Sequence, residues 1–230
     1  MVCIQGIQKL TLLDYPGKVS CTIFTGGCNL ACPFCQNSEL IPCVKAGDWT
    51  EEEILKFLKK RQGLLEGVCI SGGEPLLQSD LPLFIKKIRD LGFQVKLDTN
   101  GTFPDRLRRM IEDGLVDYVA MDIKNSLEKY KKTVGRDDCN LDAISQSAAI
   151  LLEGKVPYEF RTTVVREFHT EKDFEEIGKW IRGAEHYFLQ QFVDSERVLQ
   201  SNLHAYAAKD MEKFSRIVRN YVPTVQLRGM

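Results

Sequence analysis

The chain has 230 residues, 43% of them hydrophobic and 27% charged, which is typical of a globular protein long enough to bury a sizeable core. Its 31 lysines and arginines nearly balance 32 aspartates and glutamates, so the formal charge of -1 favours neither nucleic acid nor a membrane surface as partner. The first residues lack the pattern of a secretion signal, and no apolar run approaches the length of a membrane span. We therefore expect a cytoplasmic protein.

Strands and helices are expected to alternate along the chain. Residues 18–25 (KVSCTIFT) are rich in β-branched and aromatic side chains and end at two glycines, a pattern typical of a strand that leads into a loop. Thr50 and Glu53 match a capping box, which predicts a helix that ends before Gly63. By the same criteria, later strands are expected at 68–70, 93–97, 118–123, 158–165, 187–193 and 224–227, and later helices at 80–91, 107–114, 127–134, 142–152, 170–181 and 203–221.

This alternation predicts one α/β domain. Seven or so strands separated by helices pair in parallel through right-handed crossovers, with the helices outside the sheet. The pattern leaves open whether the sheet is doubly wound or curled into a barrel. Because no linker, low-complexity tract or internal repeat interrupts the chain, we expect a single domain over residues 1–230.

Four short motifs each follow a predicted strand. They are CNLACPFC (28–35), SGGEP (71–75), DTNG (98–101) and MDIK (121–124). The carboxyl ends of parallel strands meet at one edge of the sheet, where α/β proteins bind their ligands. We therefore expect the four motifs to form one site.

The first motif places Cys28, Cys32 and Cys35 within eight residues. In the cytoplasm thiols stay reduced, which favours a metal or a cluster over disulfides. A [4Fe-4S] cluster held by three thiolates leaves one iron free to bind the amine and carboxylate of a small molecule. A zinc site remains an alternative, and it would need a fourth ligand, for which Cys43 is the nearest downstream candidate.

The motifs resemble those of the radical S-adenosylmethionine superfamily. Cys28, Cys32 and Cys35, with Phe34 before the last, match its C-x3-C-x-aromatic-C signature, so the resemblance implies a bound [4Fe-4S] cluster. SGGEP is similar to the family motif that cradles the methionine end of S-adenosylmethionine. Glycines allow the backbone to approach a ligand closely, and the Glu74 carboxylate can accept hydrogen bonds from an ammonium group.

A narrower resemblance covers essentially the whole chain. The segments LDYPGK (13–18), FTGGCNLACPFCQN (24–37), DTNG, MDIK and VQLRG (225–229) are similar to the longer form of the activating proteins of anaerobic ribonucleoside-triphosphate reductase. These proteins are related to the pyruvate formate-lyase activating enzymes. The resemblance implies a partial (β/α)6 barrel of parallel strands with outer helices, open on one side to admit a macromolecular substrate.

The same resemblance implies reductive cleavage of S-adenosylmethionine to a 5′-deoxyadenosyl radical, which takes a hydrogen atom from a glycine of a partner enzyme. Anaerobic ribonucleotide reductase is the expected partner. The alternatives are another glycyl-radical enzyme of the pyruvate formate-lyase type, a small-molecule reaction such as 7-carboxy-7-deazaguanine synthesis, or a zinc module without catalysis. Between Cys35 and Gly72 only Cys43 and Cys69 occur, too few for a second cluster, so an external electron donor such as flavodoxin or ferredoxin is expected.

The resemblance also assigns residues around the cofactor. Asp98, Thr99 and Asp122 match positions that bind a monovalent cation in the pyruvate formate-lyase activating enzymes, and hard oxygen ligands suit such an ion. The alternative is that Asp98 begins an Asx turn and that Asp122 forms an ion pair with Lys124. Arg161 is expected to contact the cofactor's carboxylate or Glu74, with a structural ion pair as the alternative. The complete set of expected cofactor contacts is Phe34, Asn37, Gly72, Gly73, Glu74, Pro75, Asn100, Asp122, Lys124, Arg161 and Gln190.

Other polar residues are expected to have no part in the site. The three histidines carry no motif, which favours surface or helix-capping roles for all of them. They are His169, His186 and His204. Gln36 stands where many activating proteins have a histidine before the residue matching Asn37, so the hydrogen bond of that histidine is not expected here. No role is predicted for Cys3 or Cys139.

Overall fold

The computed structural model describes residues 1–42 and 47–230, so the suggestion that Cys43 ligates zinc lies outside the described residues. Its centre is an eight-stranded sheet in which spatial neighbours are also neighbours along the chain. The strands are β1 (Ile4–Thr11), β2 (Ser20–Thr25), β3 (Gly67–Gly72), β4 (Gln94–Thr99), β5 (Tyr118–Asp122), β6 (Tyr158–Val164), β7 (His186–Gln191) and β8 (Thr224–Arg228).

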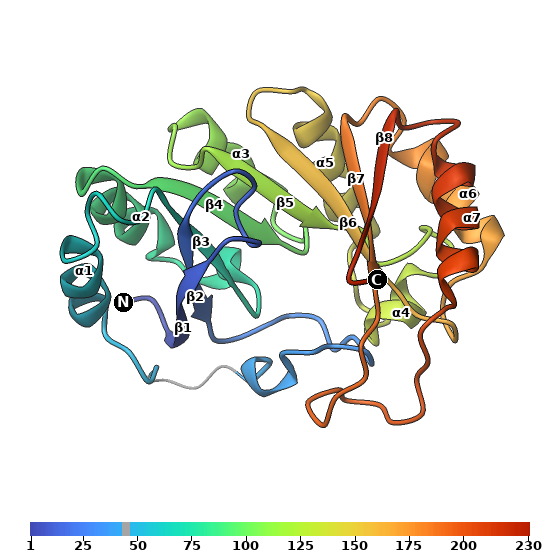
Figure 1. Cartoon of the computed structure of the whole chain (residues 1–230), viewed down its shortest axis with the longest axis horizontal. Coiled ribbons are helices and arrows are strands. Elements are labelled where there is room, and N and C mark those ends of the chain that lie inside the picture. The colour runs from blue at the N-terminus through green and yellow to red at the C-terminus, as the bar shows by residue number, and fades with distance from the viewer. Residues whose placement is uncertain (43–46) are drawn as a thin grey trace.

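Strands β2 to β8 pair in parallel, and the helices lie outside the curved sheet (Figure 1). The helices are α1 (Glu51–Lys59), α2 (Leu81–Asp90), α3 (Pro104–Glu112), α4 (Tyr130–Val134), α5 (Leu141–Leu152), α6 (Glu171–Trp180) and α7 (Ala208–Val218), with short 3-10 turns at Ser38–Leu40 and Pro75–Leu77. In the described part of the chain no pairing joins β1 to β8. The predicted fold, a partial barrel of parallel strands open on one side, is confirmed.

The first strand was not expected from the sequence. β1 pairs with β2 in antiparallel fashion, from Ile4 opposite Thr25 to Thr11 opposite Ser20, with irregular register between Ile4 and Gly6 and again before Thr11. Each irregularity shifts the side chains that follow to the other face of the strand, so no steady apolar alternation is visible in IQGIQKLT. The sequence pattern predicted no strand before residue 18, so β1 was missed.

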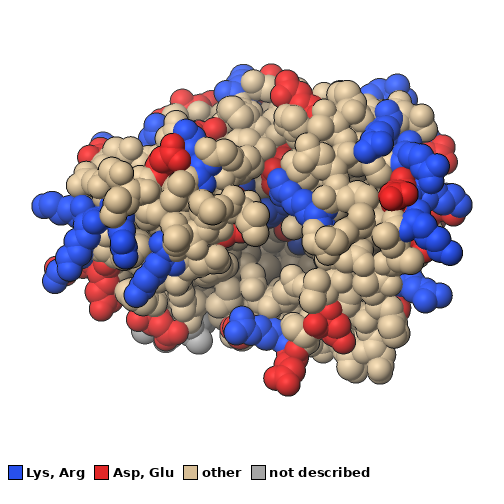
Figure 2. All heavy atoms as spheres, viewed as in Figure 1, with Lys and Arg blue, Asp and Glu red and all other residues tan. Residues whose placement is uncertain are grey.

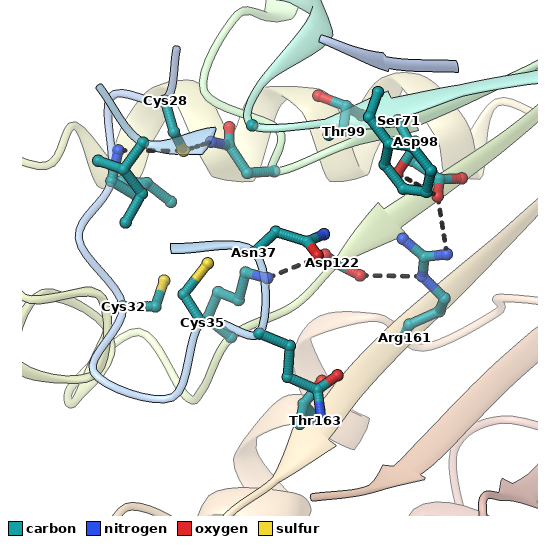
Figure 3. Close-up of a pocket in the computed structure, with 18 of the residues that line it drawn as sticks. Cys28, Cys32, Cys35, Asn37, Ser71, Asp98, Thr99, Asp122, Arg161 and Thr163 are labelled. Carbon is teal, nitrogen blue, oxygen red and sulfur yellow. Dashed lines mark hydrogen bonds and ion pairs between the residues drawn. The ribbon is translucent and has the colours of Figure 1, made fainter. Parts of the chain in front are cut away.

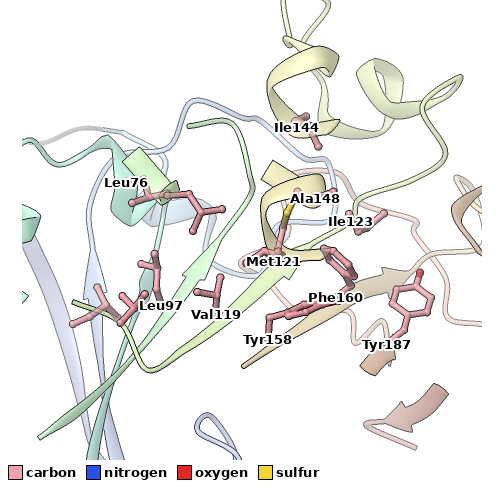
Figure 4. Packing of buried hydrophobic residues seen from close by; sticks show 14 of the residues in the cluster. Leu76, Leu97, Val119, Met121, Ile123, Ile144, Ala148, Tyr158, Phe160 and Tyr187 are labelled. Atoms are coloured by element: carbon pink, nitrogen blue, oxygen red, sulfur yellow. The ribbon is translucent and has the colours of Figure 1, made fainter. Parts of the chain in front are cut away.

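The parallel strands have an apolar outer face and a polar inner face. Leu97, Val119 and Phe160 are fully buried, and Figure 4 shows them in one cluster with side chains of α5. Burial of each such side chain contributes about 1.5–3 kcal/mol. Successive side chains of a strand point to opposite faces, so Lys96 and Glu159 point to the concave side instead. This arrangement leaves the concave side of the sheet to charged groups.

Two expected helices are shorter than their sequence pattern. The last begins at Ala208, because Leu203 is buried in a loop and the Tyr206 hydroxyl donates to the His169 carbonyl (2.7 Å). The helix expected at 127–134 begins at Tyr130. None of the helices within residues 1–42 and 47–230 combines the length and the apolarity needed to cross a membrane.

Candidate active site

A cavity of about 350 Å³ lies at the carboxyl ends of the strands. Figure 2 shows the molecule hollowed between the β1–β2 hairpin and β8, on the open side of the barrel. The volume is in the range of small-molecule sites. Residues from all four predicted motifs line the cavity: Cys28, Leu30, Cys32, Phe34, Cys35, Ser71, Gly72, Gly73, Asp98, Thr99, Asn100, Asp122 and Lys124.

Of the other residues expected to contact the cofactor, some line the cavity and some lie in the protein interior. Asn37, Arg161 and Gln190 line the cavity, whereas Glu74 and Pro75 are buried and are not among the lining residues. Pro75 begins the short turn that follows the SGGEP motif, where a proline without N–H is tolerated.

The loop that carries the three cysteines is tied to distant segments. The Ala31 N–H donates to the Val134 carbonyl at the end of α4 (3.0 Å), and the Gln200 N–H donates to the Pro33 carbonyl (2.9 Å). These bonds fix a loop that has no regular structure of its own. Figure 3 shows the three cysteine side chains of this loop around the same cavity.

Gln36, the residue after the third cysteine, has a structural contact here. Its side-chain amide donates to the Val193 carbonyl (2.9 Å) just after β7. The neighbouring Phe34 packs against Phe168, with ring centroids 5.7 Å apart. Both contacts fasten the third cysteine of the motif to the far side of the barrel.

The cysteine thiols are chemically suited to a cluster. Burial raises the pKa of Cys28 and that of Cys32, the latter to about 12, so both stay protonated near neutral pH until a metal displaces the protons. Across the described ranges, no three His, Cys, Asp or Glu side chains are grouped as ligands of one metal ion. Three sulfur donors at the rim of a cavity of this size fit a [4Fe-4S] cluster whose remaining iron faces a second ligand.

The two glycines of SGGEP are required by close backbone packing. A Cβ on Gly73 would lie 2.1 Å from the Gly27 carbonyl oxygen, and Gly72 has a φ of +119°. This approach allows the Glu74 N–H to donate to the Gly27 carbonyl (2.8 Å) and the Gly73 N–H to donate to the Thr25 carbonyl (2.9 Å). SGGEP therefore supports the start of the cysteine loop directly.

Replacing Gly73 by alanine is expected to lower the free energy of unfolding by about 1–3 kcal/mol, because the new methyl group overlaps the Gly27 backbone. Urea denaturation of the two proteins measures the difference. Gly6→Ala is the matched control, since the nearest atom to its added Cβ is 3.9 Å away. Equal losses in the two variants would contradict this explanation.

Glu74 joins two of the motifs from within the protein. Its Oε1 accepts from the Leu76 N–H (3.0 Å) and the Thr99 hydroxyl (2.8 Å), and its Oε2 accepts from the Asn100 N–H (2.7 Å). Burial raises its pKa to about 7, against the effect of these hydrogen bonds. The structure thus corrects the expectation that Glu74 binds the cofactor's ammonium: its carboxylate connects SGGEP to DTNG.

The DTNG turn continues this connection to the cysteine loop. The Asn100 amide donates to the Asn29 side-chain oxygen (3.1 Å) and lies 3.9 Å from the Cys28 sulfur. The Thr102 hydroxyl donates to the Asn100 side-chain oxygen (2.6 Å). Asn100 therefore positions the first cysteine as well as lining the cavity.

Five charged side chains, which we call the strand-end cluster, adjoin the cavity. Arg161 Nε donates to Asp122 (2.9 Å), and a second guanidinium nitrogen pairs with Asp98 (3.2 Å; Figure 3). Lys124 also pairs with Asp122 (2.9 Å), and Lys96 pairs with Asp98. The structure shows the alternative expected for Arg161, an ion pair within the protein, and its partners are the two aspartates and not Glu74.

The pKa shifts in this cluster follow from mutual pairing. Burial opposes ionisation of Asp98 and Asp122, but the Arg161 guanidinium and the lysines outweigh it and lower both pKa values. Likewise, burial disfavours the charged form of Lys124, and Asp122 reverses that effect and raises its pKa. All five groups are therefore ionised at neutral pH. Lys96 went unnoticed in the sequence, although a lysine in the strand segment VKL is a sign of a buried ion pair.

His169 was expected at the surface or at a helix cap, and this expectation was wrong. Its side chain is fully buried; Nε2 donates to the Lys124 carbonyl (2.8 Å), and Nδ1 accepts from the Val165 N–H (3.1 Å). The imidazole also lies against the Phe34 ring, at a centroid distance of 6.4 Å. His169 thus holds the MDIK turn beside the cysteine loop.

The free energy of unfolding is expected to fall as the pH drops below about 6.5, and His169 contributes to this fall. Burial lowers its pKa, so protonation is favoured in the unfolded chain and opposed in the folded one. The two charged side chains that act on its pKa, Asp173 and Lys129, have opposite signs and opposing effects. Urea denaturation at about pH 7.5 and about pH 5.5 should show a smaller decrease for His169→Gln than for wild type. Parallel decreases in both proteins would contradict this assignment.

Comparison with known proteins agrees with the site. Residues 22–181 match the model of the Radical SAM superfamily. A protein of Methanocaldococcus jannaschii, provisionally named a glycyl-radical enzyme activating enzyme, is 34% identical over 98% of this chain and 95% of its own length. The pyruvate formate-lyase-activating enzyme of Clostridium pasteurianum is 30% identical over 60% of each chain.

The fold is shared with solved structures at low sequence identity. Streptococcus suis SuiB bound to S-adenosylmethionine superimposes with a TM-score of 0.70 over 88% of this chain and 48% of SuiB, at 12% identity. This likeness concerns the fold alone, whereas the sequence matches extend across the cysteine loop and the strand ends. The chain belongs to the radical SAM superfamily, and within it to the group of the glycyl-radical enzyme activating enzymes.

Proposed function

We propose that this protein activates anaerobic ribonucleoside-triphosphate reductase by forming a glycyl radical in it. The observation that carries the proposal is the convergence of the cysteine loop with SGGEP, DTNG and MDIK on one cavity. The 34% identity with a relative named as a glycyl-radical activating enzyme, over nearly the full length of both chains, supports the substrate class. The choice of the reductase rests on the resemblance of LDYPGK and VQLRG to its activating proteins.

When bound, a [4Fe-4S] cluster and S-adenosylmethionine supply the electron transfer and the carbon radical that remove hydrogen from a glycine. The protein binds and positions these groups. Cys28, Cys32 and Cys35 supply three thiolates, while the backbone at Gly72 and Gly73 allows close approach of the methionine end. Flavodoxin or ferredoxin is the electron donor in this proposal.

The charged and polar residues at the strand ends suit the carboxylate, the ribose and the adenine of S-adenosylmethionine. Lys124 and Arg161 line the cavity and attract a carboxylate, since charge-assisted hydrogen bonds to guanidinium and ammonium groups are strong. Thr163 and Gln190 line it farther along β6 and β7, where they can contact a ribose or an adenine. These contacts would orient the cofactor with its reactive carbon toward the substrate.

The open side of the barrel offers a route for the partner's glycine. Gln8 from the edge strand β1 and Gln190 from β7, which pairs with the edge strand β8, both line the cavity, so the cavity lies near both edges of the sheet. A backbone segment with a glycine can enter deeply, because no side chain obstructs the approach to its Cα. The architecture thus favours a macromolecular substrate.

A pyruvate formate-lyase type of partner is the second candidate, since an activating enzyme of that lyase is 30% identical over 60% of this chain. The test incubates cluster-loaded protein anaerobically with S-adenosylmethionine, a reductant and either enzyme, and records electron paramagnetic resonance spectra. We expect the glycyl doublet in the reductase and not in the lyase. A doublet in the lyase alone would assign the other partner, and cleavage of S-adenosylmethionine without a doublet in either would contradict the activase proposal.

A further inference from the structure

Lys96 is a buried lysine at the base of the strand-end cluster. Its side chain is 1% exposed, and it precedes Asp98 by two residues on β4, so both side chains point to the concave face of the sheet. Lysine is almost never fully buried unless its charge is paired. Its ammonium contacts one carboxylate oxygen of Asp98 and lies 3.8 Å from the Cys69 sulfur. Asp98 lines the cavity and Lys96 does not, so Lys96 lies deeper in the protein than Asp98.

The oxygens expected to bind a monovalent cation are already engaged. The second carboxylate oxygen of Asp98 accepts from the Ser71 hydroxyl (3.0 Å) and from Arg161 (3.2 Å). The two oxygens of Asp122 accept from Arg161 and from Lys124, each at 2.9 Å. The Thr99 hydroxyl donates to Glu74 (2.8 Å). Because a hard cation needs several oxygens directed at one point, these residues do not fit the ion that the resemblance implied.

The net charge of the strand-end cluster also argues against a bound monovalent cation. Its three cationic and two anionic side chains leave one positive charge in excess. Glu159, a buried carboxylate on the same face of the sheet, forms a bidentate pair with Arg228 (2.8 and 2.9 Å), so these two side chains together add no net charge. Another cation here would be repelled in an environment that water screens poorly. An added carboxylate, by contrast, would bring the cluster to neutrality.

We propose that the Lys96 ammonium replaces the monovalent cation in this protein and makes the binding of S-adenosylmethionine independent of sodium and potassium ions. The proposal rests on the proposed function, since it concerns the cofactor of that reaction. Lys96 is a positioning residue. It holds Asp98 in place, Asp98 in turn holds Arg161, and Arg161 faces the cavity.

The first experiment measures the Kd of S-adenosylmethionine for cluster-loaded protein by equilibrium dialysis in sodium, potassium and choline chloride at equal ionic strength. Wild type should give values within about twofold of one another, because binding that takes up no ion is not linked to its concentration. A Kd that is about tenfold or more higher in choline would overturn the proposal.

Variants at position 96 distinguish the effect of the Lys96 charge on the Kd from the effect of its side-chain volume. Lys96→Ala should raise the Kd in choline by about tenfold or more, and sodium or potassium should restore most of the affinity by entering the vacated space beside Asp98. Lys96→Arg keeps the charge and should stay independent of ions. Lys87→Ala is the control, since this lysine is 52% exposed and pairs with Glu51 on the outer surface. An alanine variant with wild-type affinity in choline would overturn the proposal.

Thermal unfolding of the cluster-free proteins gives a readout that does not depend on activity. Lys96→Ala should gain Tm in sodium or potassium relative to choline, whereas wild type should not. If the alanine variant does not fold, Lys96→Met fills the same space without charge, and it should bind S-adenosylmethionine weakly in all three salts. Wild-type affinity in the methionine variant would contradict the role of Lys96.

The two proposals fail in different ways. Wild-type protein that binds no S-adenosylmethionine in any salt would contradict the proposed function. Binding that requires sodium or potassium would contradict only the role of Lys96.

Discussion

Single replacement of Cys28, Cys32 or Cys35 by serine is expected to abolish cluster binding and the cleavage of S-adenosylmethionine. Each sulfur would hold one iron corner, and a serine hydroxyl, whose alcohol stays protonated, cannot replace a thiolate. Iron and sulfide contents after anaerobic reconstitution measure the first effect, and chromatography of 5′-deoxyadenosine measures the second. Both should fall to the level of a sample without protein.

Cys139→Ser is the matched control for these variants. Cys139 is also buried, at 7% exposure, but it does not line the cavity. Its variant should keep the iron content and the cleavage rate of wild type. If the cavity variants keep their iron, or if the control loses iron to the same extent, the three-cysteine site is contradicted.

Arg161→Ala is expected to lower the free energy of unfolding by about 3–5 kcal/mol, because it leaves Asp98 and Asp122 buried with less compensation. Arg161→Lys should recover only part of the loss, since one ammonium cannot reproduce the two directions of the guanidinium fork. Urea denaturation near neutral pH measures both changes. S-adenosylmethionine should also bind more weakly to both variants.

Arg136→Ala is the control for the loss of a guanidinium group. Arg136 pairs with Asp138 at the surface, where its side chain is 47% exposed, so its removal should leave stability unchanged. A loss in Arg161→Ala no larger than that in the control would show that the strand-end cluster does not stabilise the fold.

The parallel strands and their four motifs were predictable because both signals are local. Apolar runs such as residues 118–123 mark buried strands, and parallel pairing alone brings their carboxyl ends together. The cysteine spacing is likewise complete within eight residues. β1 was missed because its irregular register with β2 removes the alternation by which strands are recognised.

The roles of buried polar residues were harder to predict from the sequence, because they depend on contacts between segments that are far apart in the chain. Glu74 accepts hydrogen bonds from residues 25 and 26 positions further along the chain, and His169 bonds the carbonyl of a residue 45 positions earlier. Nothing in SGGEP indicates that its carboxylate points inward. Lys96 differs, since its partner Asp98 is two residues away and a lysine within a buried strand already requires an opposite charge.

Transfer of a hydrogen atom from the partner's glycine is tested most directly with a deuterium label. Anaerobic ribonucleotide reductase produced with glycine deuterated at Cα would be incubated with cluster-loaded protein, S-adenosylmethionine and a reductant, and the 5′-deoxyadenosine analysed by mass spectrometry. We predict that one deuterium appears in the 5′-deoxyadenosine for each glycyl radical formed. Unlabelled 5′-deoxyadenosine, with all deuterium retained in the reductase, would contradict the proposed activity.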